Sequence, residues 1–245
     1  MDKRKFLEFC QRSHTGEKVS KDDWDMDYVI EGVRDLMDEY GFSWDKNIII
    51  PEDEKLFQDM FEASKKLIEN IGMYNLTTQR VIRFSEEEIE EGIRNMKTEL
   101  VMGEGKDAVT LTARKVEDER EPIIWAGNPG CPTPEEIYYP IIKSVAKEPL
   151  IDLLTCGSLV DVDGFAVKSG DVTEVFAVRK ELQYLHQALE EVGRPGMGLL
   201  AAERAVTEVG DFAAAYERAL RPCDSHLVAT FNELMIDNGN LLRAA

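Results

Sequence analysis

The stretch EPIIWAGNPGCPTPEE, residues 121–136, reads as a buried strand, a turn and the start of a helix. Residues 122–126 form a short apolar run of the kind found in an interior strand. Residues 127–130, Gly-Asn-Pro-Gly, have the composition of a turn. Thr133, Pro134 and Glu136 then offer an N-cap, an N1 proline and an N3 glutamate. One complete strand–turn–helix unit is therefore predicted here.

The same alternation continues downstream of this unit. Apolar strands are expected near 150–155, 196–200 and 225–230, with helices over about 173–192 and 203–220 and a further helix start at Asp237-Asn238. Near-continuous apolar strands that alternate with helices favour a parallel sheet covered by helices. The chain thus holds about three β/α units and part of a fourth.

Upstream, the first hundred residues are predicted to be mainly helical. Ser20 and Asp23 have the form of an N-cap followed three residues later by an acid, and Gly41 is a suitable helix stop. Further helices are expected between Pro51 and Gly72 and from Ser85, where Glu88 completes a capping box. Alternation over 108–113 marks the first strand. We predict a helical N-terminal region, 1–105, and the β/α units over 106–245.

Two α/β architectures agree with this pattern. One is part of a (β/α)8 TIM-type barrel, which typically needs about 250 residues for all eight units. The other is a complete open doubly wound sheet with a helical cap. Periodicity does not choose between them.

Charge and hydropathy argue against several classes of partner. The 245 residues include 48 acids and 29 bases, for a formal net charge of -19, which opposes binding to nucleic-acid phosphates or anionic lipids. The apolar runs are far shorter than the roughly 20 residues of a spanning helix. The N-terminus carries charge without the apolar stretch of a secretory signal. We expect a cytoplasmic protein with neither nucleic acid nor membrane as partner.

Cysteines and acids do not predict a metal centre. The four cysteines lie singly, so free thiols are expected rather than zinc or iron–sulfur ligation. The acids between Asp152 and Asp171 lack the order of a calcium loop. No metal is predicted.

Polar residues that could carry chemistry gather in two places. Cys223-Asp224-Ser225-His226 places an imidazole beside a carboxylate, although a loop turn capped by Asp224 or Ser225 is the favoured interpretation. Asn232 and Glu233 follow closely and suit either amine binding or a helix end. Gly196 and Gly198 permit close backbone approach but lack the third glycine of a dinucleotide fingerprint, because Ala201 occupies that position.

Several segments together resemble the N-terminal half of the monomethylamine methyltransferase family, in the same order and with similar spacing. They are GEKVSKDDWD (residues 16–25), GKDAV (105–109), GRPGMG (193–198) and DSH (224–226) followed by NEL (232–234) and ID (236–237). The similarity extends over nearly the whole chain.

The resemblance implies a (β/α)8 barrel with a helical N-terminal addition. It also implies a methylamine-type substrate and a corrinoid protein that accepts the methyl group at cobalt, so that this chain binds no cofactor directly. In the family an electrophilic pyrrolysine follows the GRPGMG segment after one further residue. Leu200 occupies that position here. Leucine offers no electrophile for an amine, so the adduct proposed for the family does not carry over.

These expectations combine into a methyltransferase of methanogenesis without pyrrolysine, truncated or split, that moves methyl from an amine to a corrinoid protein. The alternative is a catalytically inactive module that binds a corrinoid protein or a family partner. The predicted substrate-binding residues are Asn128, Arg194, Gly196, Gly198 and Leu200, and the catalytic candidates are Asp224, His226 and Glu233. Open sheet edges would also favour self-association into a homo-oligomer.

Overall fold

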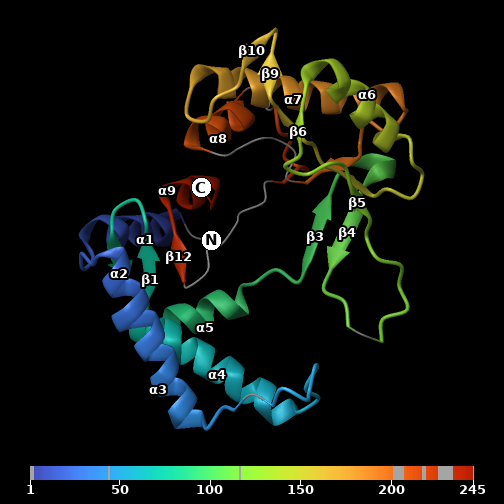
Figure 1. Cartoon of the computed structure of the whole chain (residues 1–245). Helices are drawn as coiled ribbons and strands as arrows, with labels where there is room; N and C mark the ends of the chain where they lie inside the picture. The colour runs from blue at the N-terminus through green and yellow to red at the C-terminus, as the bar shows by residue number, and fades with distance from the viewer. Residues whose placement is uncertain are drawn as a thin grey trace. The chain divides into compact units, whose positions relative to one another are not determined.

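The computed structural model describes residues 3–43, 45–115, 117–200, 207–216, 219–225 and 234–244. It divides into two compact units, the first made of 1–96 with 229–245 and the second of 97–228. Both units combine helices with short strands, which confirms an α/β fold (Figure 1). The domains 1–105 and 106–245 remain a prediction; in the structure the chain's last segment packs with the first unit.

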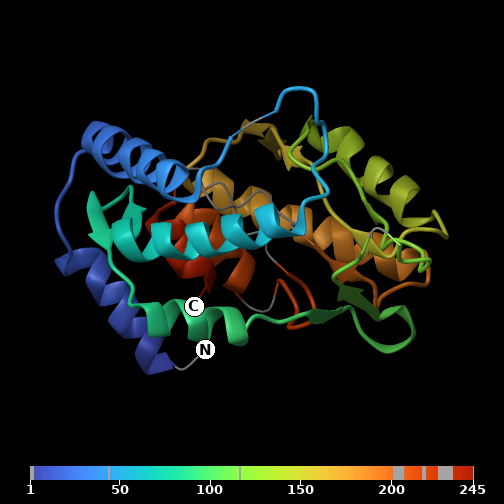
Figure 2. The same ribbon diagram turned by 90° about the horizontal axis from the view of Figure 1, so that it is seen from below.

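The first unit is built on a set of capped helices. Ser20 accepts a hydrogen bond from the Asp23 amide, and Gly41 ends the same helical run in the left-handed region at φ 67°. The capping box of Ser85 and Glu88 is present. These three predictions are confirmed. The helices are α1 (Lys3–Thr15), α2 (Lys21–Asp23), α3 (Glu31–Tyr40), α4 (Glu54–Ile71) and α5 (Glu86–Arg94), with α4 between α3 and α5 (Figure 2).

A π-helical segment, η1 (Trp24–Ile30), joins α2 to α3. Trp24 is fully buried, and its ring stacks on Tyr28 and on Tyr74, each with a centroid separation of 5.3 Å. Tyr74 also donates its hydroxyl to the Val19 carbonyl at 3.0 Å. Aromatic stacking therefore holds this unusual turn against the strand that carries Tyr74.

A small sheet, not anticipated in a region predicted to be helical, completes the first unit. Its order is β12-β1-β2, formed by β12 (Met235–Ile236), β1 (Met73–Asn75) and β2 (Arg80–Ile82). β1 runs antiparallel to β2 and parallel to β12, with Tyr74 opposite Met235. The final helix, α9 (Asn238–Ala244), begins at the predicted place and is tied to β1 by a 3.2 Å hydrogen bond between Asn75 and Asn238.

The second unit contains three parallel strands in chain order. They are β5 (Trp125–Ala126), β7 (Leu153–Leu154) and β11 (Gly198–Leu199), and β7 lies between the other two. Leu200 forms a parallel bridge with Ser225, so the next part of the chain enters beside β11. Across this sheet the strands β5, β7 and β11 therefore follow one another in chain order.

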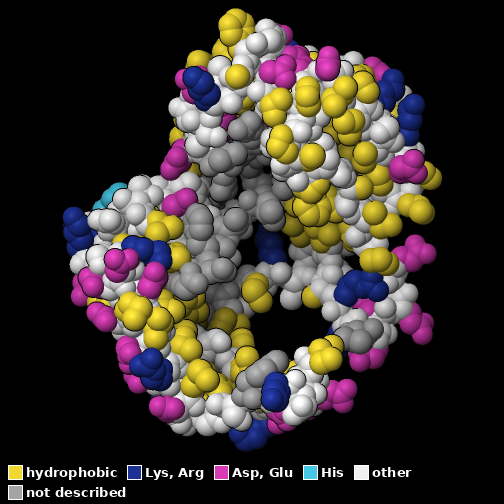
Figure 3. All heavy atoms as spheres, in the orientation of Figure 1, with side chains coloured by type: hydrophobic (Ala, Val, Ile, Leu, Met, Phe, Trp, Pro, Cys, Tyr) yellow, Lys and Arg dark blue, Asp and Glu magenta, His cyan; other side chains and the backbone are white. Residues whose placement is uncertain are grey.

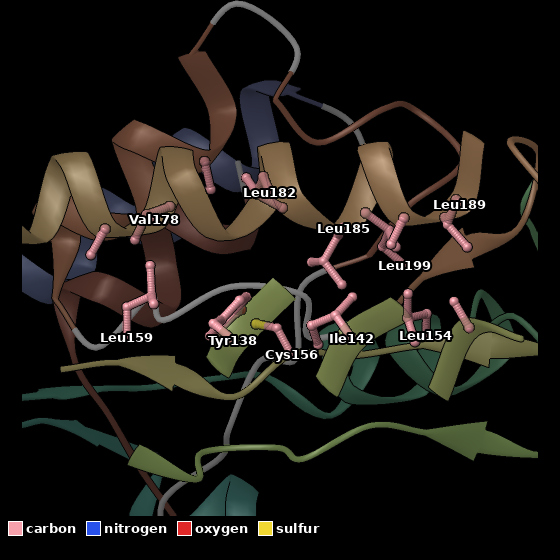
Figure 4. Close-up of a cluster of buried hydrophobic side chains, with 14 of the residues drawn as sticks. Tyr138, Ile142, Leu154, Cys156, Leu159, Val178, Leu182, Leu185, Leu189 and Leu199 are labelled. Carbon is pink, nitrogen blue, oxygen red and sulfur yellow. The ribbon is translucent and has the colours of Figure 1, made fainter. Parts of the chain in front are cut away.

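Three helices cover one face of this sheet: α6 (Glu135–Ala146), α7 (Val172–Glu191) and α8 (Glu208–Ala215). Leu154 and Leu199 point from the strands into the core, where they meet Ile142, Leu185 and Leu189 from the helices (Figure 4). All five side chains are fully buried. The core is therefore a single layer between the sheet and its helices.

The second unit also contains an antiparallel hairpin. It is formed by β3 (Glu99–Met102) and β4 (Val109–Thr112), which are joined through a 3₁₀ turn at Gly105–Asp107. Met102 is buried, and the Gly103 amide donates to the Cys223 carbonyl at 2.9 Å. The hairpin loop thus packs against the amino ends of the parallel strands.

Four two-residue strands lie beyond the carboxyl ends of β5 and β7. β6 (Pro132–Thr133) pairs in parallel with β8 (Ser158–Leu159), and β9 (Asp161–Val162) forms a hairpin with β10 (Phe165–Ala166). The prediction that Thr133 is the N-cap of α6 was wrong: Pro134 holds that place, because Thr133 is in β6 and donates its hydroxyl to Cys131 at 3.0 Å.

Other predicted elements in this unit are shorter than expected. The strand predicted over 122–126 is reduced to two residues, and the helix predicted over 203–220 is observed as α8, with 203–206 outside the described residues. Gly193, with φ at 75°, follows the end of α7, as predicted. Within the described part of the chain, no helix is long and apolar enough to cross a bilayer.

Replacing Trp24 with alanine should lower the free energy of unfolding by about 3–5 kcal/mol, because a buried aromatic ring leaves both its contacts and a cavity behind. Denaturant unfolding followed by circular dichroism measures this change. Trp24→Phe keeps a ring between the two tyrosines and serves as the control, with a smaller expected loss. Equal losses for the two variants would contradict a stabilising role for the stack.

Candidate functional site

The predicted site residues lie at both ends of the parallel sheet of the second unit. Asn128 follows the carboxyl end of β5, and Leu200 follows that of β11. Arg194 and Gly196 precede β11 at the amino end, and Gly198 is the first residue of that strand. In α/β proteins ligands bind at the carboxyl ends of parallel strands. The carboxyl end is therefore the stronger candidate.

Asn128 is held at this end with part of its amide unused. Its side-chain nitrogen donates to Thr133 Oγ1 at 3.1 Å. Its side-chain oxygen is buried and has no partner among the described residues. A Cβ at Gly157 would lie 2.4 Å from the Asn128 amide nitrogen, so glycine is required for this approach. The free oxygen can accept a hydrogen bond from a ligand N–H group.

Trp125 is a candidate that the sequence reasoning missed. The register places it level with Leu153 and Gly198, on the face of the sheet away from the helices. Its indole N–H donates to the Leu200 carbonyl at 3.2 Å, and the side chain keeps 40% of its surface exposed. The available signal was strand alternation with Ala126, which packs against the core and so puts Trp125 on the other face.

Asp224 comes one residue before Ser225, which pairs with Leu200, and its carboxylate is fully engaged. Its side chain is 0% exposed. One oxygen accepts the Leu199 amide at 2.9 Å, and the other accepts the Arg221 amide at 2.8 Å. The Arg221 guanidinium adds contacts to both oxygens at 2.9 and 3.0 Å. These contacts give Asp224 a structural role, whereas its predicted catalytic role remains a prediction.

Arg221 extends this connection to the loop before β11. Its guanidinium donates to the Pro195 and Met197 carbonyls at 2.5 and 2.6 Å. Burial lowers the pKa of Arg221, but the hydrogen bonds and charge of Asp224 outweigh that effect and hold the pKa above its ordinary value. The guanidinium is therefore a permanent cation that fixes the start of β11.

The Arg-Pro-Gly-Met-Gly segment is packed in the same way. Arg194 donates to the Ile151 carbonyl at 2.7 Å, and the Gly196 amide donates to the Asp107 carboxylate at 3.2 Å. A Cβ at Gly196 would lie 2.3 Å from the Glu104 carbonyl oxygen. Close packing under the hairpin loop explains these residue types, and their predicted substrate contact remains a prediction.

The remaining catalytic candidates, His226 and Glu233, lie outside the described residues. Their neighbour Ser225 is described, and its amide donates to the Leu199 carbonyl at 2.9 Å. The structure thus brings Asn128 and Leu200 to the carboxyl end of the sheet, where the Trp125 indole also reaches, and places Arg194 and Gly196 at the amino end. Asp224 lies beside Leu199.

A second polar network fixes the loops around the carboxyl end. Glu135 accepts hydrogen bonds from the Asp163 amide at 2.6 Å and from the Tyr184 hydroxyl at 3.0 Å, and it forms an ion pair with Lys180. Burial raises the pKa of Glu135, yet the hydrogen bonds from Lys180 and its other partners bring the pKa below its ordinary value. A charged Glu135 therefore anchors the β9–β10 hairpin to α6 and α7.

No metal centre is visible in the part of the chain that the structure describes. There, no group of three or more histidine, cysteine or acidic side chains is arranged to hold a metal ion. Cys10, Cys131, Cys156 and Cys223 are free thiols.

Comparison with known proteins gives one consistent result. A family model described as monomethylamine methyltransferase MtmB matches residues 5–245. Monomethylamine methyltransferase MtmB of Methanosarcina mazei is 33% identical over 230 residues, which are 94% of this chain and 50% of that protein. MtmB2 of Methanosarcina barkeri matches with the same identity and coverage.

Solved structures agree with these sequence matches. The crystal structure of the Methanosarcina barkeri monomethylamine methyltransferase superposes with a TM-score of 0.88 at 31% identity, covering 96% of this chain and 51% of that one. A hydroxylamine complex of MtmB matches equally well. The chain spans about half the length of the relatives that it matches.

Asp224→Ala should lower the free energy of unfolding by about 3 kcal/mol, because it leaves the partly buried Arg221 guanidinium without its partner. Chemical denaturation followed by circular dichroism tests this. Lys55→Ala, which breaks an exposed ion pair with Asp59, is the matched control and should leave the midpoint unchanged. A midpoint for Asp224→Ala equal to wild type would rule out the structural role.

Proposed function

The chain belongs to the monomethylamine methyltransferase family, and we propose that it contributes to the transfer of a methyl group from a methylamine-type substrate to the cobalt of a corrinoid protein. The observation that carries this proposal is the match of the family model to residues 5–245, together with the similar fold of the solved relative. Since the relatives are about twice as long, the complete activity is proposed for this chain within a completed barrel.

The arrangement of the second unit supports part of a (β/α)8 barrel. β5, β7, β11 and the bridge at Ser225 follow each other across the sheet in chain order, and α6, α7 and α8 cover one face. A doubly wound sheet would reverse its strand order at a switch point and place helices on both faces. Sequential order with one-sided helices is what barrel units require.

On this proposal the amine binds at the carboxyl end of the strands. The unpartnered oxygen of Asn128 would accept an N–H of the amine, and the exposed indole of Trp125 would face the positive charge of an ammonium group. Leu200 offers only an apolar wall. The amine would therefore be held by noncovalent contacts, without an adduct to the side chain at position 200.

Trp125 and Asn128 can contribute by orienting the amine. An amine is a poor leaving group, so its methyl carbon must be aligned with the incoming nucleophile. The partner's corrinoid supplies the cobalt nucleophile when it is present. Trp125 is fixed by its hydrogen bond to Leu200, and Asn128 by Thr133, so both surfaces are positioned before the substrate binds.

The second candidate function is a catalytically inactive module that binds a corrinoid protein or a family partner. The observation that favours it is Leu200 at the position that the resemblance assigns to pyrrolysine. The two functions differ in a measurable way, because the module would bind the corrinoid protein without methylating it.

The chain, completed with a polypeptide that corresponds to the uncovered half of the relatives and mixed with a reduced corrinoid protein and monomethylamine, should form methyl-cobalt, which is followed by the change in corrinoid absorbance. Asn128→Ala should lower kcat/KM about tenfold, since one neutral hydrogen bond contributes roughly 0.5–1.5 kcal/mol. Phe176→Ala, at an exposed residue on α7, is the control. Binding of the corrinoid protein without methyl-cobalt would favour the inactive module, and the absence of both would reject the two functions.

A further inference from the structure

The turn that follows β5 brings the Asn128 side chain to Thr133 in β6. The Cys131 amide donates to the Asn128 carbonyl at 3.0 Å and closes this turn. Pro129 stands at its second position and Gly130, with φ at 65°, at its third, which is the composition of a type II turn. The Asn128 side-chain nitrogen then lies 3.1 Å from Thr133 Oγ1.

Thr133 is buried, and strand pairing fixes its place. The side chain is only 2% exposed. Thr133 lies opposite Leu159 in the pairing of β6 with β8, and its carbonyl accepts the Val160 amide at 3.1 Å. The Leu159 amide is accepted in turn by the buried Glu181 carboxylate of α7 at 2.8 Å. Because its backbone is anchored in this way, Thr133 keeps its hydroxyl at one point beside Asn128.

The Thr133 hydroxyl has a single hydrogen, and the Cys131 carbonyl uses it. Oγ1 donates to that carbonyl at 3.0 Å, so only the lone pairs of Oγ1 are left for Asn128. These lone pairs accept from the NH2 group of the amide, whereas the amide oxygen has nothing to accept from them. Turning the amide over would take the hydrogen away from Cys131 and remove the partner of the Asn128 nitrogen.

The surroundings add to this constraint. A Cβ on Gly157 would lie 2.9 Å from Thr133 Oγ1 and still closer to the Asn128 nitrogen, so the Gly157 backbone confines the bonded pair. Hydrophobic side chains gather over α6 and the region of β5 and β6 in Figure 3. Apolar surroundings strengthen a hydrogen bond and penalise an unmet polar atom. The Asn128 amide is therefore held in one direction, with its oxygen turned away from Thr133.

We propose that Thr133 is a positioning residue that sets the specificity of the amine site, because it makes Asn128 present an oxygen to the ligand. The inference rests on the function proposed above. That oxygen is buried and has no hydrogen-bond partner among the described residues, so a ligand N–H group satisfies it. An ammonium ion without any N–H, or a ligand that offers only acceptors, leaves it unmet. Thr133 thus selects for N–H groups without contacting the ligand.

The first test measures the direction of the amide in the chain without ligand. In NMR spectra of the chain with isotopically labelled asparagine, the Asn128 NH2 signal is assigned through Asn128→Asp. Its exchange with solvent should be at least tenfold slower in the wild type than in Thr133→Val, which keeps a branched side chain but has no hydroxyl. Thr133→Ser should restore slow exchange. Thr110→Val, at an exposed position of β4, is the matched control and should leave the signal unchanged.

The second test compares two ligands by titration, followed by the same NMR signal. Methylammonium carries N–H groups, and tetramethylammonium carries none. The wild type and Thr133→Ser should bind methylammonium more tightly than tetramethylammonium, and in Thr133→Val this preference should fall about tenfold, as expected for the loss of one hydrogen bond. Ligand size does not affect the comparison between variants, because the same two ligands are used throughout.

The outcomes separate this inference from the proposed function. An equal preference for methylammonium in the wild type and in Thr133→Val would overturn the role of Thr133 and leave the amine site in place. If neither ion shifts the Asn128 signal in any variant, the amine site fails and the inference fails with it. Fast exchange of the Asn128 NH2 group in the wild type would also overturn it. If circular dichroism melting shows that Thr133→Val is misfolded, Thr133→Ala takes its place.

Discussion

Buried carboxylates that accept backbone amides hold the second unit together. Its parallel strands have two residues each, so the sheet alone satisfies few of the N–H groups near its ends. Asp224 accepts the Leu199 amide, Glu181 accepts the Leu159 amide at 2.8 Å, and Glu174 accepts the Gly170 amide at 2.5 Å. Each of these side chains is fully buried. In the loops, these carboxylates accept the backbone N–H groups that strand pairing would satisfy in a larger sheet.

Predictions from the sequence succeeded where local chemistry determines the structure. Helix ends depend on local chemistry, and Ser20, Gly41, Ser85 and Gly193 all act where the sequence placed them. Pairing between distant segments has no comparable local signal. β1 and β2 were therefore missed within a helical region, and the π-helical turn at Trp24 followed from its aromatic packing with Tyr74.

The candidate site was predictable only in part for the same reason. Asp224 stands beside Ser225 and His226 in the sequence, which suggests chemistry, but adjacency does not show that its oxygens are occupied by Leu199 and Arg221. Trp125 belongs to an apolar run that predicts a buried strand, and nothing within that run marks it as a ligand contact. Its exposure and its bond to Leu200 depend on the register of three strands. The sequence shows which polar and aromatic residues are present, but it does not show at which end of the sheet each one lies.

The pairing of β1 with β12 also sets an order of events during synthesis. Tyr74 lies opposite Met235, some hundred and sixty residues later, and Asn75 is bonded to Asn238. The helices α1–α5 and strand β1 leave the ribosome long before β12 is synthesised. The edge of β1 therefore stays unpaired while the second unit is translated. The second unit needs no such delay, because its strands pair with neighbours in sequence. Folding of the nascent chain should therefore begin in the second unit, and the first unit should be completed when β12 pairs with β1.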